Sequence, residues 1–241
     1  MSETLDTETL AEDVRAAGFA FVPARLMRSL LAAHGSLADW DDFAASWRDL
    51  GLDTYMADGG RYRKRRHGAF AVSAGRIIRL PDQAHYQSRD YNNLNGGIAR
   101  WFDPILPQIG DGPTMHAILA SCCDLFDRLS GARTWHTELH QFRIEARAGA
   151  AGRPTPEGMH RDGVDHVLVL LIGRTNLREG VTTTHDLSGR VLGSFTLTEP
   201  FDAALVDDHR VMHGVTPVEP IDPGRPAYRD VLVVTFRRDG A

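Results

Sequence analysis

Residues 154–172 read PTPEGMHRDGVDHVLVLLI, a turn-rich segment that runs directly into a near-continuous apolar stretch. The apolar stretch, from Val164 to Ile172, is typical of a strand that is covered on both of its faces. Further short strand-like segments follow, separated by glycine and proline residues, at 181–184, 191–197, 203–207, 215–218 and 231–236. Many short strands at this spacing predict a β-sandwich or a barrel.

The chain before this region has a different pattern. Apolar residues recur at helical spacing in 10–17, 26–31, 40–50 and 115–129. This spacing predicts amphipathic helices that pack on a core, so that Cys122 is a core residue and not a nucleophile. After Gly131 the period changes from helix to strand, because residues 136–147 alternate between two faces. We therefore expect one α+β domain over 1–241, with helices, a lid and supporting elements in 1–131 and the β core in 132–241.

Composition excludes several classes of protein. The 241 residues are 42% apolar and 24% charged, the ordinary balance of a soluble protein. A net charge of −5 argues against a nucleic-acid-binding domain, which is usually basic. No apolar run reaches the roughly 18 residues of a membrane helix, and the acidic N-terminal stretch lacks the plan of a signal peptide. The two cysteines are adjacent in sequence, so we expect a cytoplasmic protein without disulfides.

One local departure from the acidic balance is the basic cluster formed by Arg61, Arg63, Lys64, Arg65 and Arg66. Such a cluster can contact an acidic ligand. A run of charges is more often a solvated edge, however, and we expect that here.

The residues that could carry chemistry lie in segment 154–172, in the pair His160-x-Asp162. Alone this pair means little, because a chain with 11 histidines and 23 aspartates contains about one such pair by chance. Residues two apart at the end of a strand point to the same side, however. His213 follows a strand-like segment 51 residues after Asp162 and supplies a third candidate ligand.

Two imidazoles and one carboxylate on one face of a metal leave three positions open, as in the facial triad of non-haem Fe(II) oxygenases. Arg229 begins the apolar segment RDVLVVTF (229–236). An arginine that enters a buried strand is costly unless it meets an anion. It can bind the far carboxylate of a dicarboxylate such as 2-oxoglutarate through two hydrogen bonds.

These segments resemble the Fe(II)/2-oxoglutarate dioxygenases, and more narrowly the bacterial subfamily of L-isoleucine 4-hydroxylase and the BsmA-type (biofilm-stress-motility) proteins. The similar strings are YQSRDYNNLNGGIARWF (86–102), HQFRIEA (140–146), PTPEGMHRDG (154–163), DDHRVMHGVTPV (207–218) and RDVLVVTF (229–236). The resemblance implies a double-stranded β-helix (jelly-roll, cupin-like) core with N-terminal and flanking helices. It also implies that His160, Asp162 and His213 bind iron and that Arg229 binds 2-oxoglutarate. The stretch EGVTTTHD (179–186) departs from the Gly/Ser-rich strand of the family, which puts the form of the substrate pocket in doubt.

Rival residues exist for two of these roles. His136-x-Glu138 is a second His-x-acid pair, but it lies early in a strand without a turn-forming neighbourhood. His209 lies four residues before His213, in the connecting turn. Arg225 competes with Arg229 for the cosubstrate, but its neighbours are prolines of an exposed loop. We favour the triad residues and Arg229 over all three rivals.

Other contacts follow from the expected pocket. Gln141 and Thr184 are candidates for a second hydrogen bond to 2-oxoglutarate. A free amino acid offers a carboxylate, which suits arginine and amide side chains, and an ammonium, which suits carboxylates and carbonyls. The candidates for these substrate contacts are Arg143, Gln87, Asn92 and Arg100. We expect residues 86–100 to fold over the barrel mouth as part of a lid.

The sequence thus predicts an Fe(II)- and 2-oxoglutarate-dependent dioxygenase that uses O2. The resemblance implies that it hydroxylates a free aliphatic amino acid. One alternative is a cupin-like metalloenzyme that does not use 2-oxoglutarate and would not need Arg229. Another is a non-catalytic stress- or biofilm-related protein that senses a ligand, which would have no reason to keep an intact triad. Oligomeric state is left open.

Overall fold

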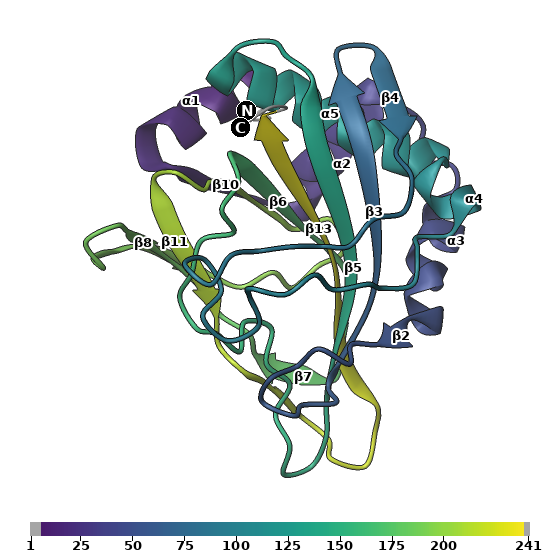
Figure 1. Ribbon diagram of the computed structural model, residues 1–241, viewed down its shortest axis with the longest axis vertical. Coiled ribbons are helices and arrows are strands. Elements are labelled where there is room, and N and C mark those ends of the chain that lie inside the picture. Colours follow the sequence, from purple (N-terminus) through teal and green to yellow (C-terminus); the bar gives the residue numbers. More distant parts are fainter. Residues whose placement is uncertain (1–5, 239–241) are drawn as a thin grey trace.

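The computed structural model describes residues 6–238, and its framework is one large antiparallel sheet (Figure 1). The strand order is β1-β10-β6-β13-β5-β3-β2, with β4 added beside β3. The strands are β1 (Phe19–Val22), β2 (Gly51–Leu52), β3 (Arg63–Ser73), β4 (Arg76–Arg79), β5 (Trp135–Ala146), β6 (His166–Thr175), β10 (Ala203–Asp207) and β13 (Ala227–Arg238). The N-terminal half therefore contributes four strands to the sheet as well as helices.

A smaller set of strands faces this sheet. One group has the order β11-β8-β9, formed by Val211–Val215, Thr182–Asp186 and Val191–Phe195. Another pairs β12 (Val218–Pro220) with β7 (Leu177–Glu179). In Figure 1, β8 and β11 lie to the left of the long central strands. Side chains of the large sheet and of β8, β9 and β11 line one cavity, which agrees with the expected jelly-roll architecture.

Helices cover the other face of the large sheet. They are α1 (Thr7–Ala17), α2 (Ala24–His34), α3 (Trp40–Ala45), η1 (Ser46–Asp49), α4 (Pro107–Gly110) and α5 (Pro113–Ser130). Helix α5 contacts α1, α2 and strand β3, so it lies at the centre of this layer. No helix within residues 6–238 combines the length and apolar character needed to cross a bilayer.

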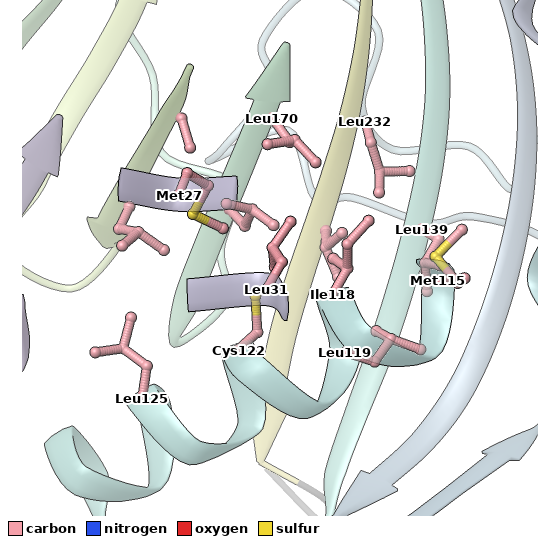
Figure 2. Close-up of a cluster of buried hydrophobic side chains, with 14 of the residues drawn as sticks. Met27, Leu31, Met115, Ile118, Leu119, Cys122, Leu125, Leu139, Leu170 and Leu232 are labelled. Carbon is pink, nitrogen blue, oxygen red and sulfur yellow. The ribbon is translucent and has the colours of Figure 1, made fainter. Parts of the chain in front are cut away.

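The main hydrophobic core lies between α2, α5 and the sheet. Figure 2 shows Met27 and Leu31 of α2 beside Ile118 and Cys122 of α5, against Leu170 and Leu232 of the sheet. Each fully buried side chain of this size contributes about 1.5–3 kcal/mol to folding. Burial raises the pKa of the Cys122 thiol far above its usual range, as expected of a core residue.

Strand alternation separates this core from the cavity. On β5, Leu139 belongs to the core, whereas Glu138, His140 and Phe142 line the cavity. On β13, Leu232 and its alternate neighbours face the core, whereas Arg229 faces the cavity. One face of the sheet therefore presents apolar side chains to the helices, and the other face presents polar and charged side chains to the cavity.

Candidate active site

The two candidate histidine ligands are joined through their backbones. His160 and His213 form an antiparallel bridge, in which each N–H donates to the other residue's carbonyl oxygen at 3.0 and 2.9 Å. Directly opposed residues present their side chains on the same face. The two rings accordingly lie 4.6 Å apart between centroids. The bridge brings together residues that are 53 positions apart in the sequence.

Asp162 is positioned by the turn that follows His160. The Asp208 carboxylate accepts hydrogen bonds from the backbone N–H groups of Asp162, Gly163 and Val164, at 2.8, 2.7 and 3.1 Å. Gly163 has φ +80°, and a Cβ atom there would lie 2.5 Å from the Tyr91 ring. Burial, and then the charge of Asp162, raise the pKa of Asp208 to about 6.

The three side chains converge with donor atoms suited to a metal. His160 Nε2 lies 3.6 Å from Asp162 Oδ1, and His213 Nε2 lies 3.7 Å from Asp162 Oδ2. His160 Nδ1 faces the Gly158 carbonyl oxygen at 3.0 Å, which fixes a proton on Nδ1 and makes Nε2 the nitrogen that can bind a metal. Two imidazole nitrogens and one carboxylate oxygen therefore fit a first-row divalent ion.

The electrostatics of the triad favour a cation. Burial disfavours a charged His160, but the contact with the Asp162 carboxylate outweighs it and raises the pKa of His160 to about 9. Burial, and then the charge of His160, lower the pKa of His213 to about 4. A single carboxylate thus draws positive charge to the place where the three side chains meet.

The triad lies at the wall of a cavity of about 320 Å³ between the two groups of strands. Arg229 lines the same cavity, is 3% exposed, and makes no side-chain hydrogen bond or ion pair with any residue in 6–238. Burial, and then the nearby charge of Arg174, lower the pKa of Arg229 to about 10. A buried cation without a partner is the expected complement of an anionic ligand.

Two of the rivals for these roles lie outside the cavity, whereas the third pair, His136 and Glu138, lines it. His209 is bonded to Asp165 at 3.1 Å and its side chain is 60% exposed. Arg225 lies in an exposed loop between β12 and β13. Neither lines the cavity.

Of the two candidates for a second cosubstrate contact, only one lies at the cavity. Thr184 is the direct cross-strand partner of His213 and lines the cavity. Gln141 is buried on the opposite face of β5, where its amide nitrogen donates to Ser46 Oγ at 2.8 Å. This placement argues against Gln141 as a cosubstrate contact.

Arg143 also departs from expectation. It shares the face of Gln141, and its guanidinium forms two hydrogen bonds with the Asp230 carboxylate at 2.7 and 2.6 Å. We expected the polar face of β5 to line the pocket. The cavity instead lies on the face that carries Phe142 and Ile144, so Arg143 is not available to a substrate there.

The loop between β4 and α4 runs from the long central strands toward β11 (Figure 1), and its residue Gln87 reaches Asp162 of the triad. The Gln87 amide nitrogen donates to the Asp162 carbonyl oxygen at 3.1 Å, and the Asn92 amide nitrogen donates to Gln87 Oε1 at 3.1 Å. Arg100 is 2% exposed and lines the cavity, yet within residues 6–238 its guanidinium has neither a hydrogen bond nor an ion pair. Gln87 therefore contacts the triad segment directly, Asn92 contacts it through Gln87, and Arg100 lines the same cavity.

A second cluster at the cavity includes Glu138, which the sequence analysis weighed in the pair His136-x-Glu138 and set aside, and three histidines that it missed. Its members are Glu138, His67, His85 and His140. The alternating pattern of β5 contained a signal for it, because Glu138 and His140 share a face. His67 and His85 come from other segments that carry no recognisable spacing.

The basic cluster is likewise not a solvated edge. Alternation along β3 directs Arg63 and Arg65 into the cavity, where both are buried near Asp53 at 2.8 and 3.7 Å. The Arg65 guanidinium also stacks 3.7 Å from the centre of the Phe102 ring. Of the five cluster residues only Arg61 is exposed, whereas Lys64 and Arg66 are half-buried.

Comparisons with known proteins agree with this geometry. Residues 44–235 match the 2OG-Fe dioxygenase family. The chain is 26% identical over 239 residues to a 3(1)-hydroxy-L-isoleucine 4-dioxygenase of Pantoea ananatis, covering 92% of both chains. It is 28% identical over 201 residues to the L-isoleucine-4-hydroxylase of Bacillus thuringiensis, covering 77% of this chain and 80% of the other.

A solved structure is similar over nearly the whole chain. It is a bsmA homolog from Methylobium petroleophilum PM1, with a TM-score of 0.88 and 38% identity, covering 99% of this chain and 95% of that one. The chain therefore belongs to the 2OG-Fe dioxygenase family and is an Fe(II)- and 2-oxoglutarate-dependent dioxygenase.

Proposed function

We propose that this enzyme hydroxylates an unactivated carbon of a free aliphatic amino acid. In this proposal His160, Asp162 and His213 hold Fe(II), and Arg229 binds the far carboxylate of 2-oxoglutarate. The observation that carries it is the presence of a metal-competent triad and an unpartnered buried arginine in one cavity. The bound iron and 2-oxoglutarate supply the oxidation of a C–H bond by O2, with succinate and CO2 as co-products.

The residues of the chain supply position and exclusion of water. Asp208 holds the turn of Asp162, and the His160–His213 bridge fixes the two imidazoles relative to each other. Thr184, beside His213, is our candidate for a further cosubstrate contact. The loop at 86–100 contacts the triad segment through the Gln87 hydrogen bond, which supports it as our candidate lid over the bound substrate.

The choice of an amino acid rests on two supports. Two of the relatives are named for action on isoleucine or its hydroxy derivative. The cavity offers Arg100, a buried and unpartnered cation, as a site for the substrate carboxylate, and Gln87 and Asn92 line the same cavity. An unactivated carbon reacts only when it is held close to the oxidant, so these contacts matter for orientation as well as affinity.

The test begins with an anaerobic titration of the metal-free protein with Fe(II) and then with 2-oxoglutarate. We expect one equivalent of each to bind. A screen of amino acids for succinate release in air should then identify substrates that raise the rate above the uncoupled background. Asp162→Ala should lose tight iron binding and succinate release while it keeps its unfolding transition.

Two results would contradict the proposal. One is a screen in which every free amino acid leaves succinate at the uncoupled background while a different class of compound raises it. The other is an Asp162→Ala variant that binds Fe(II) as tightly as the unaltered protein. Asp165→Ala, three residues away on an acid outside the cavity, is the matched control.

A further inference from the structure

The second cluster holds a carboxylate with one oxygen fixed and the other free. Glu138 Oε2 lies 2.5 Å from His85 Nδ1 and 3.2 Å from His67 Nε2. Glu138 Oε1 makes no hydrogen bond within residues 6–238. Its nearest imidazole nitrogen, His136 Nε2 at 3.6 Å, instead faces the Gln83 amide nitrogen at 3.3 Å. The cluster thus presents one unused acceptor of an oriented carboxylate to the cavity.

Glu138 is ionised in this setting. Burial alone would raise its pKa, but the contacts with His136, His67 and His85 outweigh burial and hold the pKa of Glu138 far below its usual range. Burial lowers the pKa of His85 to about 4 even though Glu138 opposes the shift, so the imidazole donates as a neutral group. The carboxylate therefore keeps a full negative charge beside the cavity.

A metal ion is a poor occupant for this cluster. His140 Nδ1 lies 2.7 Å from an Arg65 nitrogen, and because guanidinium only donates, Nδ1 must accept and Nε2 must carry the proton. His140 Nε2 lies 3.7 Å from Glu138 Oε2 and carries this proton, so it has no lone pair to offer a metal there. The positive charges of Arg65 and Arg100 further disfavour a divalent ion.

The partner charge comes from the loop over the cavity. His85 and Arg100 form an antiparallel bridge, with two backbone hydrogen bonds of 2.9 Å, and opposed residues present their side chains on the same face. His85 uses this position to bond Glu138, whereas Arg100 has no partner. Arg100 and Glu138 both line the cavity, yet no ion pair joins them within the described residues.

A cation and an anion that share a buried cavity without meeting are suited to a ligand that carries both charges. We propose that Arg100 and Glu138 together bind the substrate as a zwitterion, with Arg100 on the α-carboxylate and Glu138 on the α-ammonium. Its side chain then extends toward His160, Asp162 and His213. The inference rests on the proposed amino-acid hydroxylation and narrows the substrate to α-amino acids in which both groups are free.

The chemistry of this pair predicts strict rejection of blocked substrates. Acylation of the amine removes the positive charge and leaves Glu138 buried without its counter-ion. Conversion of the acid to an amide does the same to Arg100. A site built around buried charged groups discriminates strongly against an analogue that lacks the matching group, because the site's own charge is then left unpaired.

The test compares three probes, L-isoleucine, N-acetyl-L-isoleucine and L-isoleucinamide, by anaerobic calorimetry on the enzyme loaded with Fe(II) and 2-oxoglutarate. We expect each blocked probe to bind the unaltered enzyme about tenfold or more weakly than L-isoleucine. Glu138→Gln should remove the preference for the free amine and keep the preference for the free acid. Arg100→Met should have the reverse effect.

Controls separate recognition from damage to the fold. Both variants should retain one equivalent of iron and ordinary 2-oxoglutarate binding, since neither residue belongs to those sites. Glu145→Gln is the matched control, because Glu145 lies on the same strand outside the cavity and bonds Lys64 at 2.6 Å. It should bind all three probes as the unaltered enzyme does.

Three outcomes would overturn the inference. The first is a Glu138→Gln variant that keeps the full preference for the free amine. The second is loss of the preference for the free amine in Glu157→Gln in place of Glu138→Gln. Glu157 is another carboxylate of the cavity and lies 3.6 Å from His160 Nε2. The third is a second equivalent of bound metal that is present in the unaltered protein and absent in Glu138→Gln, which would make the cluster a metal site. If L-isoleucine neither binds nor is oxidised and no other free amino acid raises succinate release, the proposed function itself fails.

Discussion

Replacement of Arg229 by methionine should strongly weaken cosubstrate binding and at the same time make the unliganded protein more stable. Arg229 is buried, faces the cavity and has no partner among residues 6–238. Methionine has a comparable length and carries no charge, so it removes the cation without opening a large void. The two effects have opposite signs, which makes the variant more informative than a simple loss of activity.

The magnitude follows from the charge. Burial is the main reason that the pKa of Arg229 falls from its usual value to about 10. At about 1.4 kcal/mol per tenfold change, this corresponds to about 3 kcal/mol of cost in holding the unpaired cation. Relief of that cost should raise the free energy of unfolding by up to about 3 kcal/mol. Loss of a buried, doubly hydrogen-bonded charge pair should cost 2-oxoglutarate about 2–5 kcal/mol, or about 30-fold to 5000-fold in affinity.

The assay has two parts. Urea unfolding of the protein without 2-oxoglutarate measures stability, and anaerobic calorimetry with the Fe(II)-loaded protein measures cosubstrate binding. Arg225→Met, in the exposed loop before β13, should change neither quantity by more than about 0.5 kcal/mol. The reasoning is refuted if Arg229→Met binds 2-oxoglutarate as tightly as the unaltered protein, or if it loses iron and cosubstrate equally.

Three further changes test the supports of the site and the fold. Asp208→Asn should weaken metal binding about 10–100-fold with the fold intact, because fewer acceptors remain for the turn of Asp162; Asp207→Asn is the control in a metal titration. Gly163→Ala should lower the free energy of unfolding by about 1–2 kcal/mol, measured in urea, because its φ of +80° strains any other residue; an unchanged value would exclude strain at this turn. Burial lowers the pKa of His166 to about 4, so the unfolded chain binds the extra proton first and stability is lost as pH falls from about 6.5 to about 4. The loss is about 3 kcal/mol, and His166→Phe should flatten that part of the stability–pH curve; an equally steep curve in the variant would assign the slope to other groups.

The sequence carried the candidate iron and cosubstrate residues because each lies at a recognisable point of a strand or turn. His160 and Asp162 are two apart beside an apolar run, and Arg229 opens another. Period-two alternation also separated the two faces of β5 correctly. It could not say which face meets the cavity, because that depends on where the second group of strands packs. Gln141 and Arg143 were therefore expected on the face of β5 that lines the cavity, whereas they lie on the opposite face.

The Glu138 cluster shows the other limit of sequence reasoning. Its carboxylate lies on β5, His67 lies on β3, and His85 lies in the loop that bridges back to Arg100. No spacing links these positions, and only the packing of the loop on the sheet brings them together. The same holds for Arg63 and Arg65, since a basic run is interior or exposed according to what covers its strand.

The order of strands in the large sheet has a consequence for biosynthesis. Strand β13 follows every other described strand in the chain, yet it lies between β6 and β5 and pairs with both along most of its length. While the ribosome is still adding the residues before it, β5 and β6 each have an unpaired edge, and neither half of the sheet is joined to the other. Such edges favour association between nascent chains. We therefore expect the folding yield in cells to depend on how quickly the segment Ala227–Arg238 emerges and on chaperones that shield the waiting strands.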